Sequence, residues 1–231
     1  MTAPTAPLSH SAQDYLKTIY LLGERGDGPV STSGLSEWLG LSASTVSGML
    51  RKLTAHKLID HEPYGDISLT DPGRTIALAV VRRHRLVEMF LVTHLAYRWD
   101  EVHQEAEILE HAVSDLLIQR IDTALGSPRF GPHGDPIPSV SGEVPIVDAK
   151  RMSALPPGST GTLVRVDDHD PEVLQHLTQV GITLGEQIEL LERLPFGGGQ
   201  LVRAGVATHH FPPALAAALW VNPTDLDAAQ T

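Results

Sequence analysis

The pattern of apolar residues in the first quarter of the chain predicts three short amphipathic helices. Apolar positions recur three and four residues apart within 11–22, 33–39 and 43–53, a spacing that places them on one helical face. Ser42 precedes the third segment as an expected N-cap, and Gly40 fits the C-terminal cap of the second. The short interval between the last two helices predicts a helix-turn-helix.

Two strand-like runs, 58–62 and 67–70, follow the third helix and are joined by a tight turn from Pro63 to Asp66. A hairpin in this position is typical of the wing of a winged helix. Asp71 and Pro72 then predict the N-cap and first turn of a long helix. Residues 1–75 are therefore predicted to form a winged helix-turn-helix domain that binds DNA.

The outer face of the third helix carries small hydrogen-bonding groups followed by two cations. Hydroxyl groups can contact base edges or phosphates in a major groove, and cations can contact the phosphate backbone. An ordinary solvent-exposed helix face is the alternative interpretation. The predicted DNA-contacting residues are Ser42, Ser44, Thr45, Ser47, Gly48, Arg51 and Lys52.

Residues 76–126 are predicted to be helical and contain an unusual cluster of acidic residues and histidines. Four of them fall within an arc of roughly 100° if one continuous helix runs on from Asp100. Neighbouring like charges repel each other, so the cluster favours a bound cation. A solvated, charge-laced helix with incidental histidines is the alternative. The four are His103, Glu107, Glu110 and His111, and the preceding helix carries a second pair, His84 and Glu88.

The remaining chain changes character twice. Residues 127–157 are rich in proline without periodicity, which predicts a linker. Short strand-like runs separated by glycine-rich turns follow, and they predict an SH3-like small β-barrel over 158–231. The expected fold class is therefore α+β and multidomain, with a winged helix-turn-helix, an all-α domain and a barrel.

Composition limits the chemistry. There are no cysteines, so a metal must be held by oxygen and nitrogen. No apolar run approaches membrane-spanning length and no export signal is visible, so a cytoplasmic protein with no membrane partner is expected. The net charge of −11 argues against nucleic acid, yet acidic residues outnumber basic ones by only 8 to 6 over 1–75, against 12 to 6 over 127–231.

An enzyme is the main alternative from another class, because carboxylates and histidines on paired helices also build di-iron sites. Those sites use Glu-x-x-His pairs, and no histidine on the two candidate helices has glutamate three residues before it. Motifs for a nucleophilic serine, a P-loop or a zinc protease are also missing from the sequence. Neither an enzyme nor a small-molecule substrate is expected. A metal-independent winged-helix regulator stays open, and DNA binding in chelator would distinguish it.

Six segments between Asp14 and Pro138 occur in a characteristic order. They read D-Y-L-K-T-I-Y, S-A-S-T-V-S, L-T-D-P-G-R, V-R-R-H-R-L-V-E, V-H-Q-E-A-E-I-L-E-H-A-V-S-D and F-G-P-H-G-D-P-I-P. These segments resemble the metal-dependent bacterial transcriptional regulators typified by the diphtheria toxin repressor. The resemblance implies a homodimer that binds an inverted-repeat operator in double-stranded DNA and represses metal-uptake genes when metal is replete.

The resemblance also implies two metal sites per chain. Lys17 stands where members with a binuclear cluster have a second bridging glutamate, so two separated sites are expected. The barrel sometimes lends an oxygen ligand to the second site, and Asp170 is the candidate here. The first site would use Asp14, Glu107, Glu110 and His111, and the second would use His84, Glu88 and His103.

The resemblance finally bears on the identity of the metal. Iron-responsive members have a methionine and a cysteine where this chain has Asp14 and Glu107, whereas manganese-responsive members have the two carboxylates. Mn²⁺ is therefore the expected cofactor, with Fe²⁺ as the alternative.

Overall fold

The protein divides into two compact units. Its structure, a computed structural model, describes residues 8–26, 28–62 and 65–224. The first unit runs to His84 and includes 138–143, and the second contains 85–137 and the chain from Val144 onward. The division falls inside one long helix, so it differs from the domain boundary expected near residue 75.

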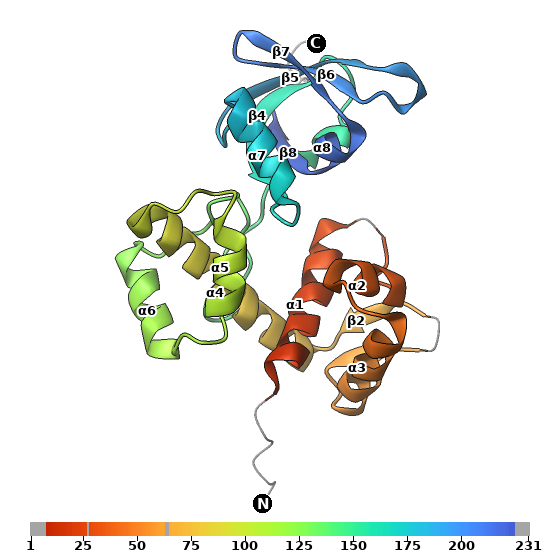
Figure 1. Cartoon of the computed structure of the whole chain (residues 1–231), viewed down its shortest axis with the longest axis vertical. Helices are drawn as coiled ribbons and strands as arrows, with labels where there is room; N and C mark the ends of the chain where they lie inside the picture. Colours follow the sequence, from red (N-terminus) through yellow and green to blue (C-terminus); the bar gives the residue numbers. More distant parts are fainter. Residues whose placement is uncertain (1–7, 27, 63–64, 225–231) are drawn as a thin grey trace, which may run out of the picture. The chain divides into compact units, whose positions relative to one another are not determined.

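The first unit begins with three helices, α1 (His10–Arg25), α2 (Thr32–Leu39) and α3 (Ala43–Ala55), shown in Figure 1. Their apolar faces bury Leu16, Leu35 and Leu50. Serine side chains cap all three, and Gly40 ends α2 with φ of 62°. The predicted helix-turn-helix is thus present, although α1 begins slightly earlier than expected because Ser9 accepts the first-turn hydrogen bond.

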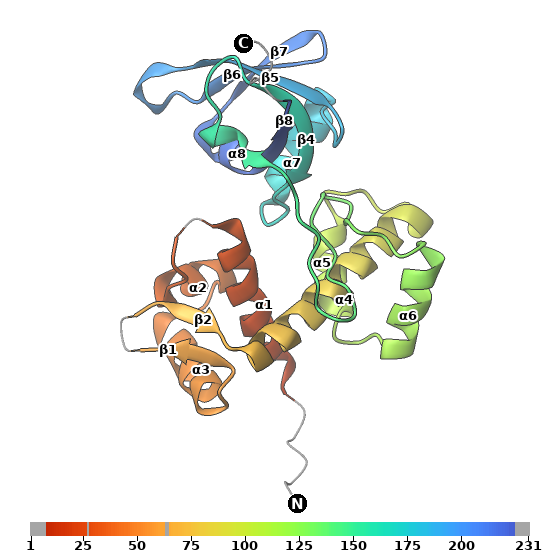
Figure 2. The same cartoon turned by 180° about the vertical axis from the view of Figure 1, so that it is seen from behind.

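A two-stranded hairpin follows α3 and forms the predicted wing (Figure 2). Strand β1 (Ile59–His61) pairs antiparallel with β2 (Ile67–Leu69). The backbone N–H of Ile67 also donates to the carbonyl of Val30 at 2.9 Å, which fastens the hairpin to the loop before α2. The expected turn at Pro63 and Tyr64 lies outside the described residues.

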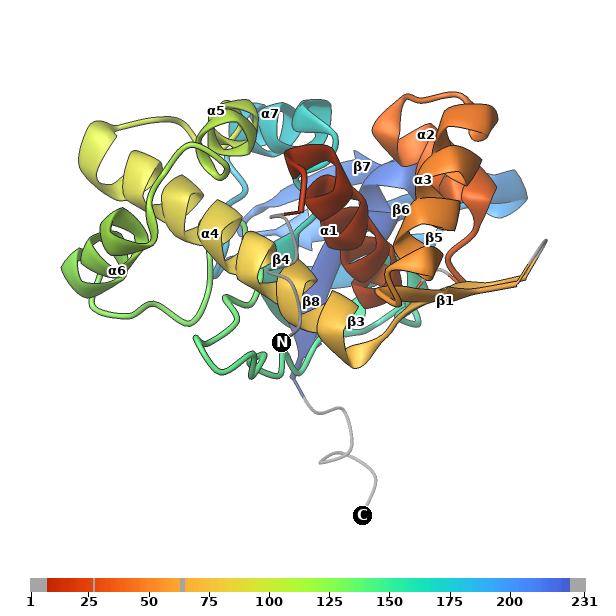
Figure 3. The same ribbon diagram turned by 90° about the horizontal axis from the view of Figure 1, so that it is seen from below.

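Helix α4 (Asp71–Leu95) is the long helix expected after the wing (Figure 3). Its N-cap is Thr70 rather than Asp71, because the Thr70 hydroxyl accepts the backbone N–H of Gly73 at 3.2 Å. The part of α4 in the second unit buries Leu86, Val87 and Leu91. Within the described part of the chain, no helix combines the length and apolar content needed to cross a bilayer.

The prediction that one continuous helix runs on from Asp100 is wrong. Helix α5 (Val102–Leu109) ends after two turns, and α6 (Asp115–Ala124) begins after a short connection. The hydroxyl of Ser114 accepts the backbone N–H of Leu117 at 3.2 Å and so caps a new helix. Glu110 and His111 therefore lie just beyond the end of α5, although Glu110 keeps helical backbone angles and its N–H donates to the carbonyl of Ala106 at 2.9 Å.

The C-terminal part of the second unit is the predicted β-domain. Its six strands follow the order β3-β8-β4-β5-β6-β7, with antiparallel neighbours throughout. Sequence patterns missed β3, β8 and the helices α7 and α8. The strands are β3 (Lys150–Arg151), β4 (Thr160–Val166), β5 (Gln187–Arg193), β6 (Gln200–Ala204), β7 (Ala207–Phe211) and β8 (Leu219–Pro223), with helices η1 (Met152–Ala154), α7 (Pro171–Val180), η2 (Pro195–Gly197) and α8 (Pro213–Ala217).

The segment expected as a linker, 127–157, is not an extended connection throughout. Its first part folds back on itself, because the N–H of Ile137 donates to the carbonyl of Arg129 at 2.8 Å. Ile137 joins the core formed by α4, α5 and α6, and His133 is completely buried. We call residues 129–137 the proline loop.

Candidate metal centre

Four side chains of the second unit converge from α4, α5, the proline loop and the turn after β4. The Nδ1 atom of His103 lies 3.3 Å from Glu88 Oε1 and 3.1 Å from Asp168 Oδ2. The Nδ1 atom of His133 lies 3.3 Å from Asp168 Oδ2 and 4.0 Å from Glu88 Oε2. We call Glu88, His103, His133 and Asp168 the Glu88 cluster.

Packing of the surrounding apolar residues points these side chains inward. Val87 and Leu91 belong to the helical core, which fixes the rotation of α4 and leaves Glu88 only 1% exposed. His84 precedes Glu88 by one helical turn, so it lies on the same face of α4, and it is also buried. On α5, the burial of Ala106 places His103 at the edge of the same core.

His133 presents one defined ring nitrogen to the cluster. Its Nε2 atom lies 2.7 Å from the carbonyl oxygen of Trp99 and donates to it. The Nδ1 atom is therefore the one that faces Asp168 and Glu88, and it is buried 3.3 Å from Asp168 Oδ2. Metal-binding histidines are commonly oriented in this way through their second nitrogen. A buried nitrogen opposite two carboxylates fits a site for a cation.

The carboxylates shift the pKa values of both histidines. Burial lowers the pKa of His103, but hydrogen bonds and charges from Asp168 and Glu88 outweigh it and raise the pKa to about 11. Burial also lowers the pKa of His133, but the hydrogen bond and charge of Asp168, with the charge of Glu88, outweigh it and raise this pKa to about 9. Burial raises the pKa of Asp168, yet the two histidines hold it well below its ordinary value. Without metal both rings are protonated near neutral pH, so a metal must displace protons.

The donor set of the Glu88 cluster fits a divalent cation. Ligand atoms of Glu88, His103 and Asp168 lie within 4.8 Å of one another. Two carboxylates and two imidazoles are hard or intermediate donors, which suit Mn²⁺, Fe²⁺ or Zn²⁺. His84 can add a third imidazole from the preceding turn of α4.

A second group of predicted ligands lies at the end of α5. Glu110 is 1% exposed, and its Oε1 atom is 3.4 Å from His111 Nε2. Glu107 is half-exposed and its carboxylate lies 3.6 Å from His103 Nε2, so it contacts the Glu88 cluster. Asp14 lies on α1 in the first unit. We call Glu110 and His111 the Glu110 pair.

The predicted DNA-contacting residues lie on the exposed face of α3, and only Gly48 is partly buried. The Ser42 hydroxyl accepts the backbone N–H of Thr45 at 3.2 Å, so this residue caps the helix. Arg51 and Lys52 are exposed on the third turn of the helix.

Asp170, the predicted barrel ligand, has a different contact. Its carboxylate accepts the backbone N–H of Glu172 at 3.0 Å and caps α7. Asp168 instead reaches His103, and sequence reasoning missed both Asp168 and His133. His133 lies in the F-G-P-H-G-D-P-I-P segment and Asp168 lies two residues before the candidate Asp170, but only the fold shows which residues face the cluster.

The sequence matches three protein families. The iron dependent repressor N-terminal DNA binding domain matches residues 7–67, and the iron dependent repressor metal binding and dimerisation domain matches 70–139. The FeoA domain matches residues 150–223. The chain is 32% identical to the iron-dependent repressor IdeR of Mycobacterium tuberculosis over 227 residues, which cover 93% of this chain and 98% of that protein.

Solved structures are also similar to this chain. A manganese-dependent transcriptional repressor in complex with manganese has a TM-score of 0.88 and 48% sequence identity, covering 92% of this chain and all of the other. The manganese regulator SloR has a TM-score of 0.80 and 32% identity, covering 92% of this chain and 98% of the other.

Proposed function

We propose that this chain responds to Mn²⁺. It belongs to the iron-dependent repressor family, which includes the diphtheria toxin repressor, and is a metal-dependent transcriptional repressor. The same matches confirm the expected fold class and the expectation that the chain is not an enzyme. Fe²⁺ is the alternative metal, since the similar IdeR protein is iron-dependent.

The donor chemistry carries the choice of Mn²⁺. All predicted ligands are carboxylates and imidazoles, and the chain has no cysteine. Hard oxygen donors suit Mn²⁺, whereas sulfur donors favour softer ions. Identity supports the same choice, because the manganese-dependent repressor of known structure is 48% identical and the iron-dependent relative is 32% identical.

We propose two separate metal sites. The first metal site joins the Glu110 pair to Asp14 of the other unit and to Glu107, whose half-exposed side chain can turn toward Glu110. The second metal site is the Glu88 cluster with His84. A cation bound at the first site supplies a positive charge that two units can share. The residues Asp14 and Glu110 would then hold the DNA-binding unit in one orientation.

We further propose that the active form is a cytoplasmic homodimer. Four large apolar side chains on the helices of the second unit are exposed, and burying them against a second copy would remove a large apolar area from water. A two-fold dimer presents two α3 helices, which fits an inverted-repeat operator upstream of metal-uptake genes. The exposed residues are Leu95, Ile108, Leu116 and Leu117.

Selection of genomic DNA fragments by the full-length protein tests the proposed function. The selection is done with Mn²⁺, with Fe²⁺ under anaerobic conditions, with Zn²⁺ and with chelator. We expect enrichment of fragments with an inverted repeat in Mn²⁺ and no enrichment in chelator. Equal enrichment in chelator would show that the chain regulates without metal, and enrichment in Fe²⁺ alone would establish the iron-responsive alternative.

A further inference from the structure

A buried carboxylate in the second unit lies between two arginines. The Oδ1 atom of Asp135 is 2.7 Å from Arg165 Nε and 3.5 Å from Arg85 Nη2. Arg85 also donates from Nη1 to the carbonyl of Pro136 at 2.5 Å. Asp135 is 6% exposed and Arg85 is 4% exposed. We call Arg85, Asp135 and Arg165 the Asp135 triad.

Each member of the triad is close in sequence to one donor of the Glu88 cluster. The three elements that supply these donors therefore meet at a single carboxylate, and the triad fixes their separation. The pairs are Arg85 with Glu88 on α4, Asp135 with His133 in the proline loop, and Arg165 with Asp168 on and just after β4.

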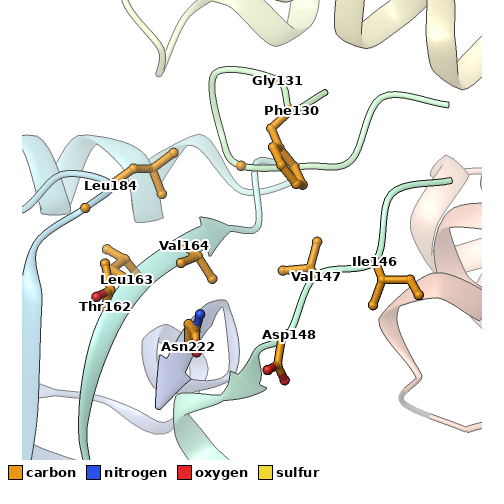
Figure 4. Close-up of a pocket in the computed structure, with 12 residues that line it drawn as sticks. Phe130, Gly131, Ile146, Val147, Asp148, Thr162, Leu163, Val164, Leu184 and Asn222 are labelled. Atoms are coloured by element: carbon orange, nitrogen blue, oxygen red, sulfur yellow. The ribbon is translucent and has the colours of Figure 1, made fainter. Parts of the chain in front are cut away.

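The proline loop is attached to β4 near Asp135 rather than along its whole length. Gly134, which has φ of +84°, lies directly against β4, because a Cβ at this position would be only 1.9 Å from the carbonyl oxygen of Val164. The backbone N–H of Val166 also donates to the carbonyl of His133 at 2.9 Å. Beside these contacts a groove of about 450 Å³ separates the Phe130 end of the loop from β4 (Figure 4).

The charges of the triad make Asp135 difficult to replace. Two guanidinium groups face one carboxylate, so removing that carboxylate leaves two buried cations close to a proposed cation site. Arg165 is also held on its other side, because its guanidinium lies 4.7 Å from the ring centre of Trp220.

We propose that Asp135 is a positioning residue of the second metal site, which holds His133, Glu88 and Asp168 at the separation that a divalent cation needs. The inference rests on the proposed function, because it assumes that the Glu88 cluster binds metal. Asp135 does not itself bind the cation, since its carboxylate is directed to the two arginines. It lies within 4.8 Å of donor atoms on His133 and Asp168, so direct ligation is the alternative.

Metal titration of the full-length Asp135→Asn variant tests the proposal. The parent carries Glu110→Gln, so that the second metal site is measured alone by calorimetry with Mn²⁺ and by absorption with Co²⁺. Loss of residues that orient metal ligands commonly weakens metal binding by about 10- to 100-fold, and we expect a loss in that range. The absorption spectrum at Co²⁺ saturation should match the parent, because the ligands are the same.

Two further variants sharpen this experiment. Glu189→Gln removes a carboxylate that lies 2.6 Å from Arg203 on the exposed part of the same β-domain, and it should leave metal binding unchanged. Arg165→Lys keeps the charge but alters the geometry of the triad, so metal binding should weaken by less than in Asp135→Asn. Circular dichroism checks that each variant folds. If Asp135→Asn does not fold, the metal affinity of Arg165→Lys tests the role of the triad instead.

Three outcomes would overturn the proposal. An altered Co²⁺ spectrum at saturation would make Asp135 a ligand. Unchanged affinity in folded Asp135→Asn or Arg165→Lys would leave the second metal site standing without a role for the triad. If Glu88→Gln does not reduce the amount of Mn²⁺ bound, the second metal site itself is wrong, and the positioning role is wrong with it.

Discussion

The Glu88 cluster and the Glu110 pair use the same chemistry but differ in how they are assembled. The Glu88 cluster draws four donors from elements of one compact unit, and its histidines already lie within 3.3 Å of carboxylate oxygens. The Glu110 pair has two buried or nearly buried donors, and its proposed partner Asp14 belongs to the other unit.

This difference suggests different roles. The four donors of the Glu88 cluster belong to one unit, and His84, the last residue of the first unit before the division in α4, lies on the same helix as Glu88. A site of this kind can bind metal without changing how the two units are oriented, so it stabilises the fold around it. A site shared by two units can bind strongly only when they adopt one arrangement, and metal therefore selects that arrangement. We expect the first metal site to control DNA binding and the second to maintain the second unit.

The largest expected effect comes from breaking the shared site. Glu110→Gln or Asp14→Asn should weaken Mn²⁺-dependent operator binding by about 100-fold or more, since loss of a ligand exceeds the 10- to 100-fold typical of residues that orient ligands. Binding of Mn²⁺ to the Glu88 cluster should persist. Fluorescence anisotropy with labelled operator and calorimetry measure the two quantities. Full operator binding by either variant would contradict the assigned roles.

A smaller effect is expected from pH at the Glu88 cluster. His103 and His133 have raised pKa values of about 11 and about 9, so metal binding at pH 7 should release protons. The affinity for metal should therefore increase with pH, by up to about tenfold per pH unit for each proton released. Calorimetry in buffers with different ionisation enthalpies counts the protons. Release of none would show that the rings are neutral in the metal-free protein.

The same pKa values affect the stability of the metal-free protein. A histidine whose pKa is higher in the folded than in the unfolded protein stabilises the fold. This contribution is complete at pH values below the unfolded-state pKa and is lost as the pH rises through the folded-state pKa. The metal-free protein should therefore lose thermal stability between about pH 7 and pH 11. The matched variant His133→Gln should lose less over this range.

The smallest effect concerns DNA contacts that involve no metal. Arg51→Ala should weaken binding to all DNA sequences and reduce the slope of log affinity against log salt by about one, with metal binding unchanged. Arg203→Ala, which removes an exposed arginine of the β-domain, is the control and should leave the slope unchanged. If Arg51→Ala changed the preferred sequence and kept the slope, Arg51 would contact bases rather than phosphate.

Sequence patterns predicted the elements that depend on local spacing. The helix-turn-helix follows from apolar periodicity, from Ser42 as a cap and from Gly40 as a terminator, and all three features are present. The end of α5 was missed because the apolar pattern continues through Glu110. Only the cap at Ser114 indicates a second helix, and serine is common without that role.

The proposed metal ligands were predictable from local spacing only where they share a helix. His84 and Glu88 follow from their spacing on α4, whereas Asp168 reaches His103 across 65 positions of the sequence. Its neighbour Asp170 was the equally acidic choice and instead caps α7. No local pattern distinguishes the two, because the contact depends on how β4 and the proline loop pack together.

Operator binding measured against buffered free metal tests the proposed response to Mn²⁺ most directly. The full-length protein is titrated with Mn²⁺, and separately with Fe²⁺ under anaerobic conditions, on one labelled operator taken from the genomic selection. We expect half-maximal binding at free Mn²⁺ concentrations that a bacterial cytosol contains, and Fe²⁺ to activate only above the concentrations that cells maintain. Activation by Fe²⁺ within the cellular range, with Mn²⁺ required above it, would contradict the account.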